Sequence, residues 1–151
     1  AIPDVTIRTT LIVGFPGETK EDFKELEDFV KETKFDKLGA FQYSKEEGTP
    51  AAKLPDQIHG NTKKARYNKI MSEQQKNSND ILKNKIGKKC EVLIEETSFD
   101  NKFYIGRTMQ DVPEIDGLVY IKNDGQENIL NTFVKCEVID VKNYDLIAKI
   151  V

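Results

Sequence analysis

The sequence has no tryptophan, one histidine and only two cysteines among its 151 residues. The cysteines, Cys90 and Cys136, lie far apart and form no CxxC pair, so the sequence predicts neither a zinc site nor a disulfide framework. We expect both to be ordinary, half-buried strand thiols. The histidine, His59, stands in a loop without companion ligands, which argues against a metal or catalytic role.

The sequence also lacks any apolar run near the roughly 20 residues that a membrane-spanning helix needs. Its first five residues have neither the basic nor the apolar region of a signal peptide. With 38% hydrophobic and 32% charged residues, the composition is that of a soluble globular protein with one medium domain or two small ones. A cytoplasmic location is therefore the default expectation.

The charge is spread unevenly along the chain, whose net charge is −3. Residues 1–86 hold 15 basic and 14 acidic residues, whereas residues 87–151 hold 8 basic and 12 acidic ones, a net of −4. The second half is therefore acidic, which bears on the partners it can bind.

Residues 5–13 are rich in β-branched side chains and predict a strand buried on both faces of a parallel sheet. Thr19 is a good N-cap, and Asp22 completes a capping-box-like pattern for a helix over residues 20–33. A second strand is expected over residues 37–43, which gives a strand, helix, strand unit with parallel strands. The apolar face of the helix is expected to comprise Phe23, Leu26, Phe29 and Val30.

Residues 44–61 contain two glycines and two prolines and predict a long loop. One long helix is expected over residues 62–86, or two helices with a break near residues 76–79, and Gly87 is expected to end it. Its apolar face would comprise Ala65, Ile70, Met71, Ile81 and Leu82.

Beyond Gly87 the hydrophobic pattern becomes strand-like. Five short strands in such a small segment predict a closed antiparallel β-barrel, because closure removes exposed strand edges. Its aromatic residues are expected in the barrel core. The fold class is thus α/β plus all-β, with domains at residues 1–86 and 87–151. The expected strands are residues 89–96, 102–107, 117–121, 133–141 and 146–151.

The segment with most chemical promise is Gly14-Phe-Pro-Gly17, at the carboxyl end of the first strand. In α/β barrels the chemistry gathers at this end of the strands, and glycine lets the backbone approach a ligand. Taken alone, such a turn between a strand and a helix is a weak signal that favours a tight structural turn.

Longer stretches around this turn resemble a known family. Arg8 to Thr19 (RTTLIVGFPGET) resembles the fifth-strand motif of radical S-adenosylmethionine methylthiotransferases. Phe41 to Ala52 (FQYSKEEGTPAA) and Leu54 to Gln57 (LPDQ) resemble the strand and loop that follow it. Gly106-Arg107 and Pro113 to Gly117 (PEIDG) resemble the TRAM domain that closes these enzymes. The resemblance covers essentially the whole chain.

The resemblance implies the C-terminal strands and helices of a partial TIM barrel, followed by an OB-like TRAM barrel. It also implies that the full-length parent uses S-adenosylmethionine and two [4Fe-4S] clusters. The sequence holds no CxxxCxxC motif, and neither Cys90 nor Cys136 matches a cluster ligand of the family. We therefore expect a C-terminal fragment that is not catalytically competent alone and carries neither catalytic residues nor bound cofactor.

The resemblance also implies which residues face the cofactor. Ile12, Val13 and Gly14 match positions that contact the adenine, and Glu18 matches the acid of the motif, one residue later than in its shorter form. Further candidates are Arg8, Tyr43 and Ser44. The alternative is that Arg8 is an ordinary surface arginine and that Tyr43 and Ser44 only pack at the end of the strand. Arg8 is expected on the side of the strand opposite the apolar positions.

TRAM domains commonly bind RNA, for which a basic face would be expected, but this one is acidic. An acidic barrel suits a basic protein partner, because complementary charges favour encounter. The sequence also resembles most the branch of the family that methylthiolates an aspartate of ribosomal protein S twelve. The candidate contacts are Asp111, Glu114 and Asp116, unless they form only a solvated acidic turn. The alternatives are a fragment of a tRNA adenosine methylthiotransferase and a non-catalytic TRAM binding module.

Overall fold

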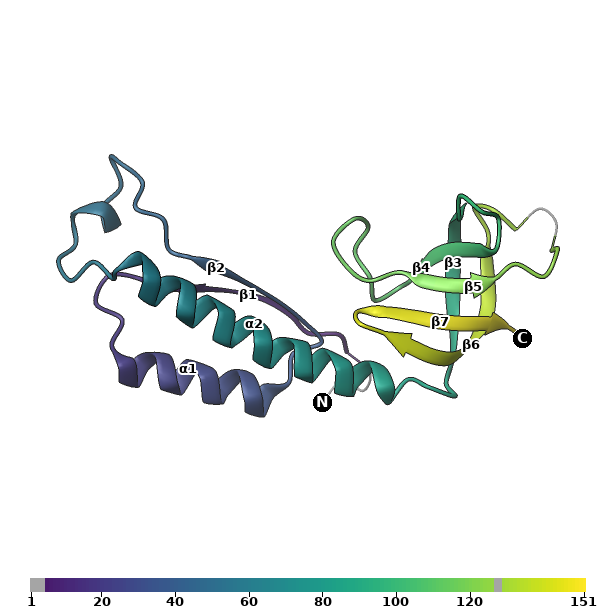
Figure 1. Ribbon diagram of the computed structural model, residues 1–151, viewed down its shortest axis with the longest axis horizontal. Helices are drawn as coiled ribbons and strands as arrows, with labels where there is room; N and C mark the ends of the chain where they lie inside the picture. The colour runs from purple at the N-terminus through teal and green to yellow at the C-terminus, as the bar shows by residue number, and fades with distance from the viewer. Residues whose placement is uncertain (1–4, 127–128) are drawn as a thin grey trace. The chain divides into compact units, whose positions relative to one another are not determined.

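The computed structural model describes residues 5–126 and 129–151 and divides the chain into two compact units (Figure 1). The units are Ala1–Ser78 and Asn79–Val151. The division falls inside a helix, eight residues before the domain boundary expected from the sequence at residue 86. Each unit has its own hydrophobic core.

The first unit begins with the expected strand, helix and strand. Strand β1 spans Arg8–Val13, helix α1 spans Lys20–Thr33 and strand β2 spans Lys37–Gln42. The strands pair in parallel, from Arg8 opposite Lys37 to Val13 opposite Gln42. The following loop holds a 3-10 turn, η1, at Ala51–Lys53, before helix α2 at Gly60–Lys83.

Helix α1 starts at the expected cap. The Thr19 hydroxyl accepts a hydrogen bond of 3.0 Å from the Asp22 backbone N–H, and the Asp22 carboxylate accepts one of 2.9 Å from the Thr19 N–H. Along the helix, Phe23 and Val30 are buried as expected, but Phe29 is 50% exposed. Glu27 is buried instead and pairs with two lysines, an arrangement that an apolar periodicity does not reveal.

One face of the two-stranded sheet packs against the helices. Val13, Leu38 and Ala40 from the sheet join Phe23 and Val30 from α1 and Ile70 from α2 in one core cluster. The prediction that the first strand is buried on both faces is wrong, because side chains on the opposite face of the sheet are exposed. There Ile12 is 57% exposed and Phe41 is 62% exposed.

Helix α2 is continuous, without the alternative break, and ends at Lys83, before Gly87. The face that it turns toward the first unit is more polar than expected. Arg66, Gln74 and Asn77 are buried there, whereas Ala65 is exposed. The amide groups of Gln74 and Asn77 donate to the Phe35 and Val30 carbonyls at 2.9 and 3.1 Å. No helix in the described ranges is long and apolar enough to cross a membrane.

The second unit is the expected closed five-stranded barrel, in the order β3, β4, β5, β7, β6. It is mixed and not antiparallel as predicted, because β5 and β7 pair in parallel. β4 and β6 both run antiparallel to β3, and β5 and β7 run antiparallel to β4 and β6. β5 and β7 therefore run in the same direction where they close the barrel. The strands are β3 Lys89–Thr97, β4 Phe103–Thr108, β5 Val119–Lys122, β6 Phe133–Lys142 and β7 Asp145–Ile150.

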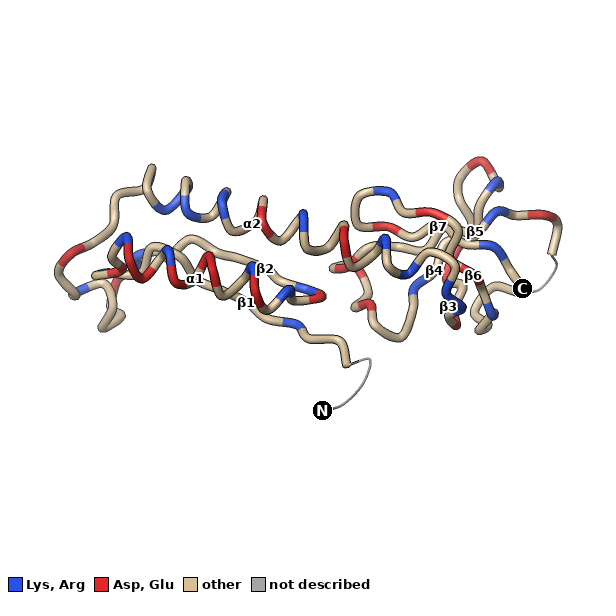
Figure 2. Tube along the Cα trace, turned by 90° about the horizontal axis from the view of Figure 1, so that it is seen from below, with Lys and Arg blue, Asp and Glu red and all other residues tan. Residues whose placement is uncertain are grey.

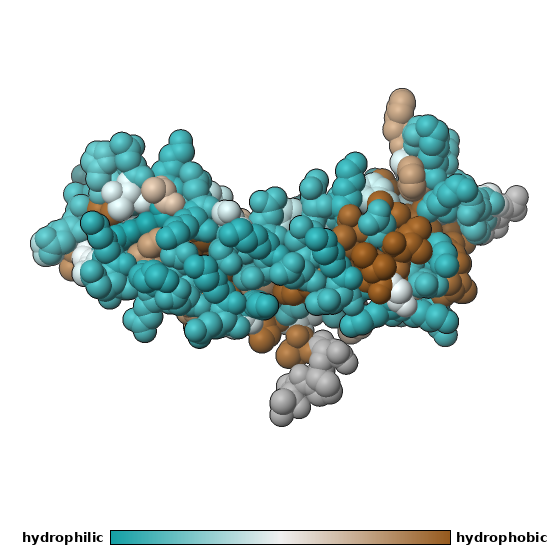
Figure 3. All heavy atoms as spheres, turned by 60° about the horizontal axis from the view of Figure 1, so that its bottom comes forward, coloured by the Kyte–Doolittle hydropathy of each residue, from teal (hydrophilic) through white to brown (hydrophobic). Residues whose placement is uncertain are grey.

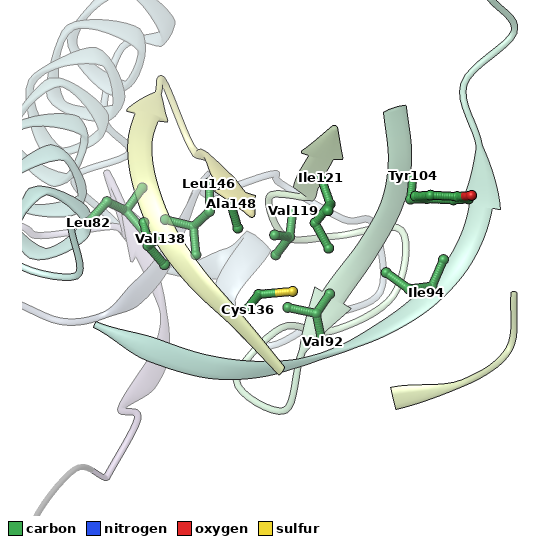
Figure 4. Packing of buried hydrophobic residues seen from close by; sticks show 10 residues of the cluster. All are labelled: Leu82, Val92, Ile94, Tyr104, Val119, Ile121, Cys136, Val138, Leu146 and Ala148. Atoms are coloured by element: carbon green, nitrogen blue, oxygen red, sulfur yellow. The ribbon is translucent and has the colours of Figure 1, made fainter. Parts of the chain in front are cut away.

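Small aliphatic side chains fill the barrel (Figure 4). The prediction that its aromatic residues form the core is wrong except for Tyr104, which is 6% exposed. Phe99 and Phe133 are 107% and 67% exposed, since they lie in a turn and on an outward strand position. Both cysteines are free thiols on strands; Cys90 is half-buried as expected, whereas Cys136 is fully buried in the core. The labelled core residues include Val92, Ile94, Val119, Ile121, Val138 and Leu146.

Candidate functional site

The exposed face of the two-stranded sheet carries an apolar pair at its carboxyl end. Ile12 of β1 and Phe41 of β2 lie directly opposite each other in the parallel register. Because successive side chains of a strand alternate between faces, Arg8 and Thr10 share this face with Ile12. The Arg8 side chain therefore lies on the face of the sheet away from the buried Val13. It shares its face with Ile12, so the expectation that Arg8 faces away from the apolar positions holds only in part. The pair forms a flat apolar surface where β1 and β2 end.

The turn after β1 is held by hydrogen bonds within the chain. Gly14 is buried and has a φ of +74°, a conformation that favours glycine. Its N–H donates to Oε2 of Glu18 at 2.8 Å, and the Glu18 N–H donates to the Phe15 carbonyl at 3.0 Å. The Gly17 N–H donates to the Asp56 carbonyl at 3.0 Å, which joins the turn to the following loop.

Arg66, from the second turn of α2, contacts the other side of Glu18. The Arg66 guanidinium pairs with Oε1 of Glu18 and also donates to the Glu18 and Thr19 carbonyls, both at 3.1 Å. The side chains of Arg66 and Glu18 are only 8% and 12% exposed. The guanidinium also lies over the Phe23 ring, 5.3 Å from its centroid. Both carboxylate oxygens of Glu18 are therefore engaged inside the first unit.

Tyr43 follows β2 beside the turn. Its N–H donates to the Val13 carbonyl at 2.9 Å, and its own carbonyl accepts from the Lys63 ammonium at 2.9 Å. The Tyr43 ring meets Phe15 edge-on, with 5.2 Å between ring centroids, and the Lys63 ammonium lies 5.0 Å from its centroid. Among the described residues, the Tyr43 hydroxyl is buried and has no hydrogen-bond partner. Such a group requires a partner to offset the cost of its burial.

The structure thus brings together Ile12, Gly14, Glu18 and Tyr43 around the carboxyl ends of β1 and β2. Val13 is adjacent, but its side chain is fully buried in the core and offers no surface to a ligand. Arg8 lies at the other end of the strand. Ser44 is exposed, and its hydroxyl donates to Glu46 at 2.7 Å.

Sequence reasoning missed Phe41 as a surface residue, and it missed Lys63 and Arg66 altogether. Phe41 could have been found from the parallel register, which sets it opposite Ile12. Arg66 and Glu18 are 48 residues apart in the chain, and no local sequence pattern indicates their contact.

In the second unit, the three acids expected to contact a partner lie on the loop between β4 and β5. The Asp111 carboxylate accepts from the Thr108 N–H at 3.1 Å and from its hydroxyl at 2.6 Å. The Asp116 carboxylate accepts from the Val112 N–H at 2.7 Å. Glu114 is exposed and has a φ of +62°. Two of the acids therefore shape the loop.

The same loop exposes apolar side chains. Met109 is 97% exposed, Ile115 is 71% exposed and Val112 is 39% exposed. A loop held by its own carboxylates can keep such side chains in solvent in a fixed arrangement. Figure 3 shows, in addition, a continuous hydrophobic area on the visible face of the barrel.

Basic and acidic residues are interspersed along the chain of the barrel (Figure 2), and several of them form ion pairs. Arg107 contacts Glu95 at 2.9 Å, Lys122 contacts Asp124 at 2.8 Å, and Lys149 contacts Glu137 at 3.3 Å. These cations are partly neutralised by their partners and do not form a basic stripe of the kind that phosphate backbones prefer.

No group of three or more His, Cys, Asp or Glu side chains suited to a metal ion occurs in the part of the chain that the structure describes.

Comparison with known proteins agrees with this two-part organisation. Residues 86–151 match the family model of the TRAM domain. The chain is 60% identical over 99% of its length to ribosomal protein uS12 methylthiotransferase RimO of Alkaliphilus oremlandii, of which it spans 34%. It is 48% identical over 97% of its length to RimO of Clostridium perfringens and 51% identical over 99% to that of Clostridioides difficile, spanning 32% and 33% of them.

The chain therefore spans about a third of the length of the curated relatives it matches, and the matched segment is their C-terminal part. A solved multidomain protein with nucleic acid binding domains from Streptococcus pneumoniae shares 12% identity over 45% of this chain and 23% of its own, with a TM-score of 0.34. That likeness is too low to bear on the fold or on function.

Proposed function

We propose that this chain is the C-terminal part of an enzyme that methylthiolates an aspartate of ribosomal protein uS12 in the cytoplasm. The observation that carries this proposal is identity of 48 to 60% with uS12 methylthiotransferases, extending over 97 to 99% of the chain and through both units.

The strand-end site fits the adenosine part of S-adenosylmethionine. Ile12 and Phe41 offer an exposed apolar surface where β1 and β2 end. A planar base binds well against apolar side chains beside a few polar groups. S-adenosylmethionine and the iron–sulfur clusters supply the radical chemistry when bound to the full-length enzyme.

Within this chain, the residues have binding and orienting roles. Ile12 and Phe41 cover one side of the base and exclude water from it. Glu18 acts on the turn and not on the ligand, since both its oxygens are engaged. Val13 contributes through its backbone, which fixes the position of Tyr43.

We assign the barrel to recognition of uS12, a basic protein, through the loop at residues 109–116. The net charge of residues 87–151 is −4, which favours encounter with a basic partner. The exposed Met109 and Ile115 provide apolar contact area, and Glu114 is the acid of the loop best placed to meet a cation. Asp111 and Asp116 contribute by holding the loop.

A second candidate is a tRNA adenosine methylthiotransferase, which is favoured by the exposed aromatic side chains of the barrel. Phe99, Phe133 and Tyr144 are 107%, 67% and 43% exposed, and exposed aromatic rings can stack on bases. Against this candidate stand the acidic charge and the acid-paired cations of the barrel.

Binding of the 151-residue chain to uS12 and to tRNA separates the candidates. We expect binding to purified uS12 that weakens as salt is raised, because charge attraction contributes to it. We expect tRNA binding to be at least about tenfold weaker at the same salt. The reverse order of affinities would favour the tRNA enzyme, and binding to neither would remove the barrel from substrate recognition.

A further inference from the structure

We propose that helix α2 sets the geometry of the strand-end site, with Arg66 and Lys63 as positioning residues for the S-adenosylmethionine that the full-length enzyme binds. This inference rests on the proposed function. It concerns residues outside the quoted motifs, since Lys63 and Arg66 follow the motif at residues 8–19 by more than forty residues.

Arg66 makes three hydrogen bonds to the turn after β1, two to Glu18 and one to Thr19. One guanidinium nitrogen meets the Glu18 carboxylate and carbonyl, and the other donates to the Thr19 carbonyl at 3.1 Å. A planar guanidinium suits several acceptors at once, which a lysine ammonium on a flexible stem does not. Arg66 is only 7% exposed, so water competes little with these acceptors for the guanidinium hydrogens.

Glu18 transmits this constraint to Gly14. Its second carboxylate oxygen accepts the Gly14 N–H at 2.8 Å. The Gly14 amide hydrogen is therefore already used and is not the group that meets a ligand. The chain of contacts from Arg66 through Glu18 determines the orientation of the backbone that a ligand would approach.

Lys63 lies one turn before Arg66 on the same face of α2 and contacts both strand ends. A Cβ atom at Gly14 would lie 2.5 Å from Cγ of Lys63, so the lysine stem occupies the space left by the missing side chain. The Lys63 ammonium donates to the Tyr43 carbonyl at 2.9 Å. One helical turn thus fixes the ends of β1 and β2 relative to each other.

The matched control for Arg66 is Asn77. Asn77 is also a buried polar residue of α2, and its amide donates to the Val30 carbonyl at 3.1 Å, away from the turn. Asn77→Ala should destabilise the first unit without moving the turn. It therefore separates a positioning role from a merely structural one.

The test has two readouts. The first is hydrogen exchange of the Gly14 amide in the 151-residue chain, and the second is the dissociation constant of S-adenosylmethionine for the reconstituted full-length enzyme. We expect Arg66→Met to raise the exchange rate of the Gly14 amide by about tenfold or more. It should also raise the dissociation constant of S-adenosylmethionine by about tenfold or more, since small misplacements of binding groups are costly. Asn77→Ala should change both by less than about twofold, even at an equal loss of thermal stability.

Arg66→Lys keeps the test decisive if Arg66→Met folds poorly, and a double variant tests whether Arg66 acts through Glu18. Arg66→Lys keeps the charge but loses the planar geometry, so it should fold and give intermediate values. Adding Glu18→Gln to Arg66→Met should raise the dissociation constant of S-adenosylmethionine no further, because both residues act through one contact.

Unchanged exchange at Gly14 in Arg66→Met and Arg66→Lys would overturn the inference. Equal effects of Asn77→Ala and Arg66→Met on S-adenosylmethionine would overturn it as well. A wild-type enzyme that binds no S-adenosylmethionine would overturn the proposed function, and exchange at Gly14 would still decide whether α2 sets the turn.

Discussion

Cys90 and Cys136 lie directly opposite each other on β3 and β6, and both are free thiols. Burial, and then the nearby Cys90, raise the pKa of the Cys136 thiol to about 12, and burial raises the pKa of Cys90 as well. The reactive form of cysteine is the thiolate, so the folded barrel should protect Cys136 from thiol reagents.

The prediction for Cys136 concerns a chain that carries Cys90→Ser and therefore has one thiol. At pH 8 the folded chain should react with a disulfide reagent at least about a hundredfold more slowly than the same chain in guanidinium, because little thiolate forms. The unfolded chain is the control for reagent activity. Equal rates in the folded and unfolded states would show that the barrel does not bury this residue.

Glu27 is a buried acid of α1 that pairs with two lysines. Its carboxylate contacts Lys31 and Lys69, each at 2.7 Å. Hydrogen bonds from Lys31 and then Lys69 lower the pKa of Glu27 from 4.5 to about 2. Because the folded pKa is depressed, the stability from this site is present above pH 4.5 and is lost as pH falls toward 2.

Glu27→Gln should therefore lower the free energy of unfolding by about 1 kcal/mol at pH 7, a modest value because both lysines are partly exposed. The difference from wild type should shrink as pH falls from 4.5 to about 2. Urea unfolding followed by circular dichroism measures it. Glu25→Gln, at an exposed position of the same helix, is the control and should behave as wild type. A difference that stays constant with pH would refute the assigned cause.

How far the sequence predicts this fold depends on how local each feature is. The cap at Thr19 and the five barrel strands follow from short patterns, and the structure confirms them. The parallel closure of β5 on β7 depends on residues far apart in the chain, such as Val119 and Leu146. Burial of Glu27 and exposure of Phe99 depend on their surroundings, which hydropathy does not encode.

The candidate site divides in the same way. Gly14 and Ile12 follow from the motif, because a strand that ends in a glycine turn fixes where they lie. The parallel pairing adds Phe41, which needs the register of β2. Arg66 enters only through the packing of α2, which no pattern around Glu18 indicates.

Gly106 of β4 is predicted to be essential for barrel closure. A Cβ atom there would lie 2.1 Å from the backbone oxygen of Leu93 on the neighbouring strand. Gly106→Ala should destabilise the barrel by about 3 kcal/mol, since backbone atoms can move only if the strands separate. Gly39→Ala is the matched control, because nothing lies within 4 Å of a Cβ atom there.

Hydrogen exchange of β3 and β4 amides measures this effect. Exchange in Gly106→Ala should rise sharply, whereas Gly39→Ala should leave these amides unchanged. Wild-type protection in Gly106→Ala would mean that the strands are less tightly packed than described.

The loop at residues 109–116 is predicted to contact uS12 through apolar side chains. Replacing Met109 and Ile115 with serine together should weaken uS12 binding by about tenfold or more, because both side chains are exposed and would be buried on docking. Phe99→Ser removes an equally exposed side chain from another turn and is the control. If Phe99→Ser weakens binding while the double variant does not, the contact lies elsewhere on the barrel.

The most direct test of the proposed function uses the full-length protein that contains this chain. The reconstituted enzyme is incubated with S-adenosylmethionine, a sulfur source and a reductant, together with uS12 and tRNA in one mixture, and both substrates are analysed by mass spectrometry. We predict that uS12 gains one methylthio group on an aspartate and that the tRNA is unchanged. A methylthio group on tRNA adenosine, with uS12 unmodified, would contradict the proposal.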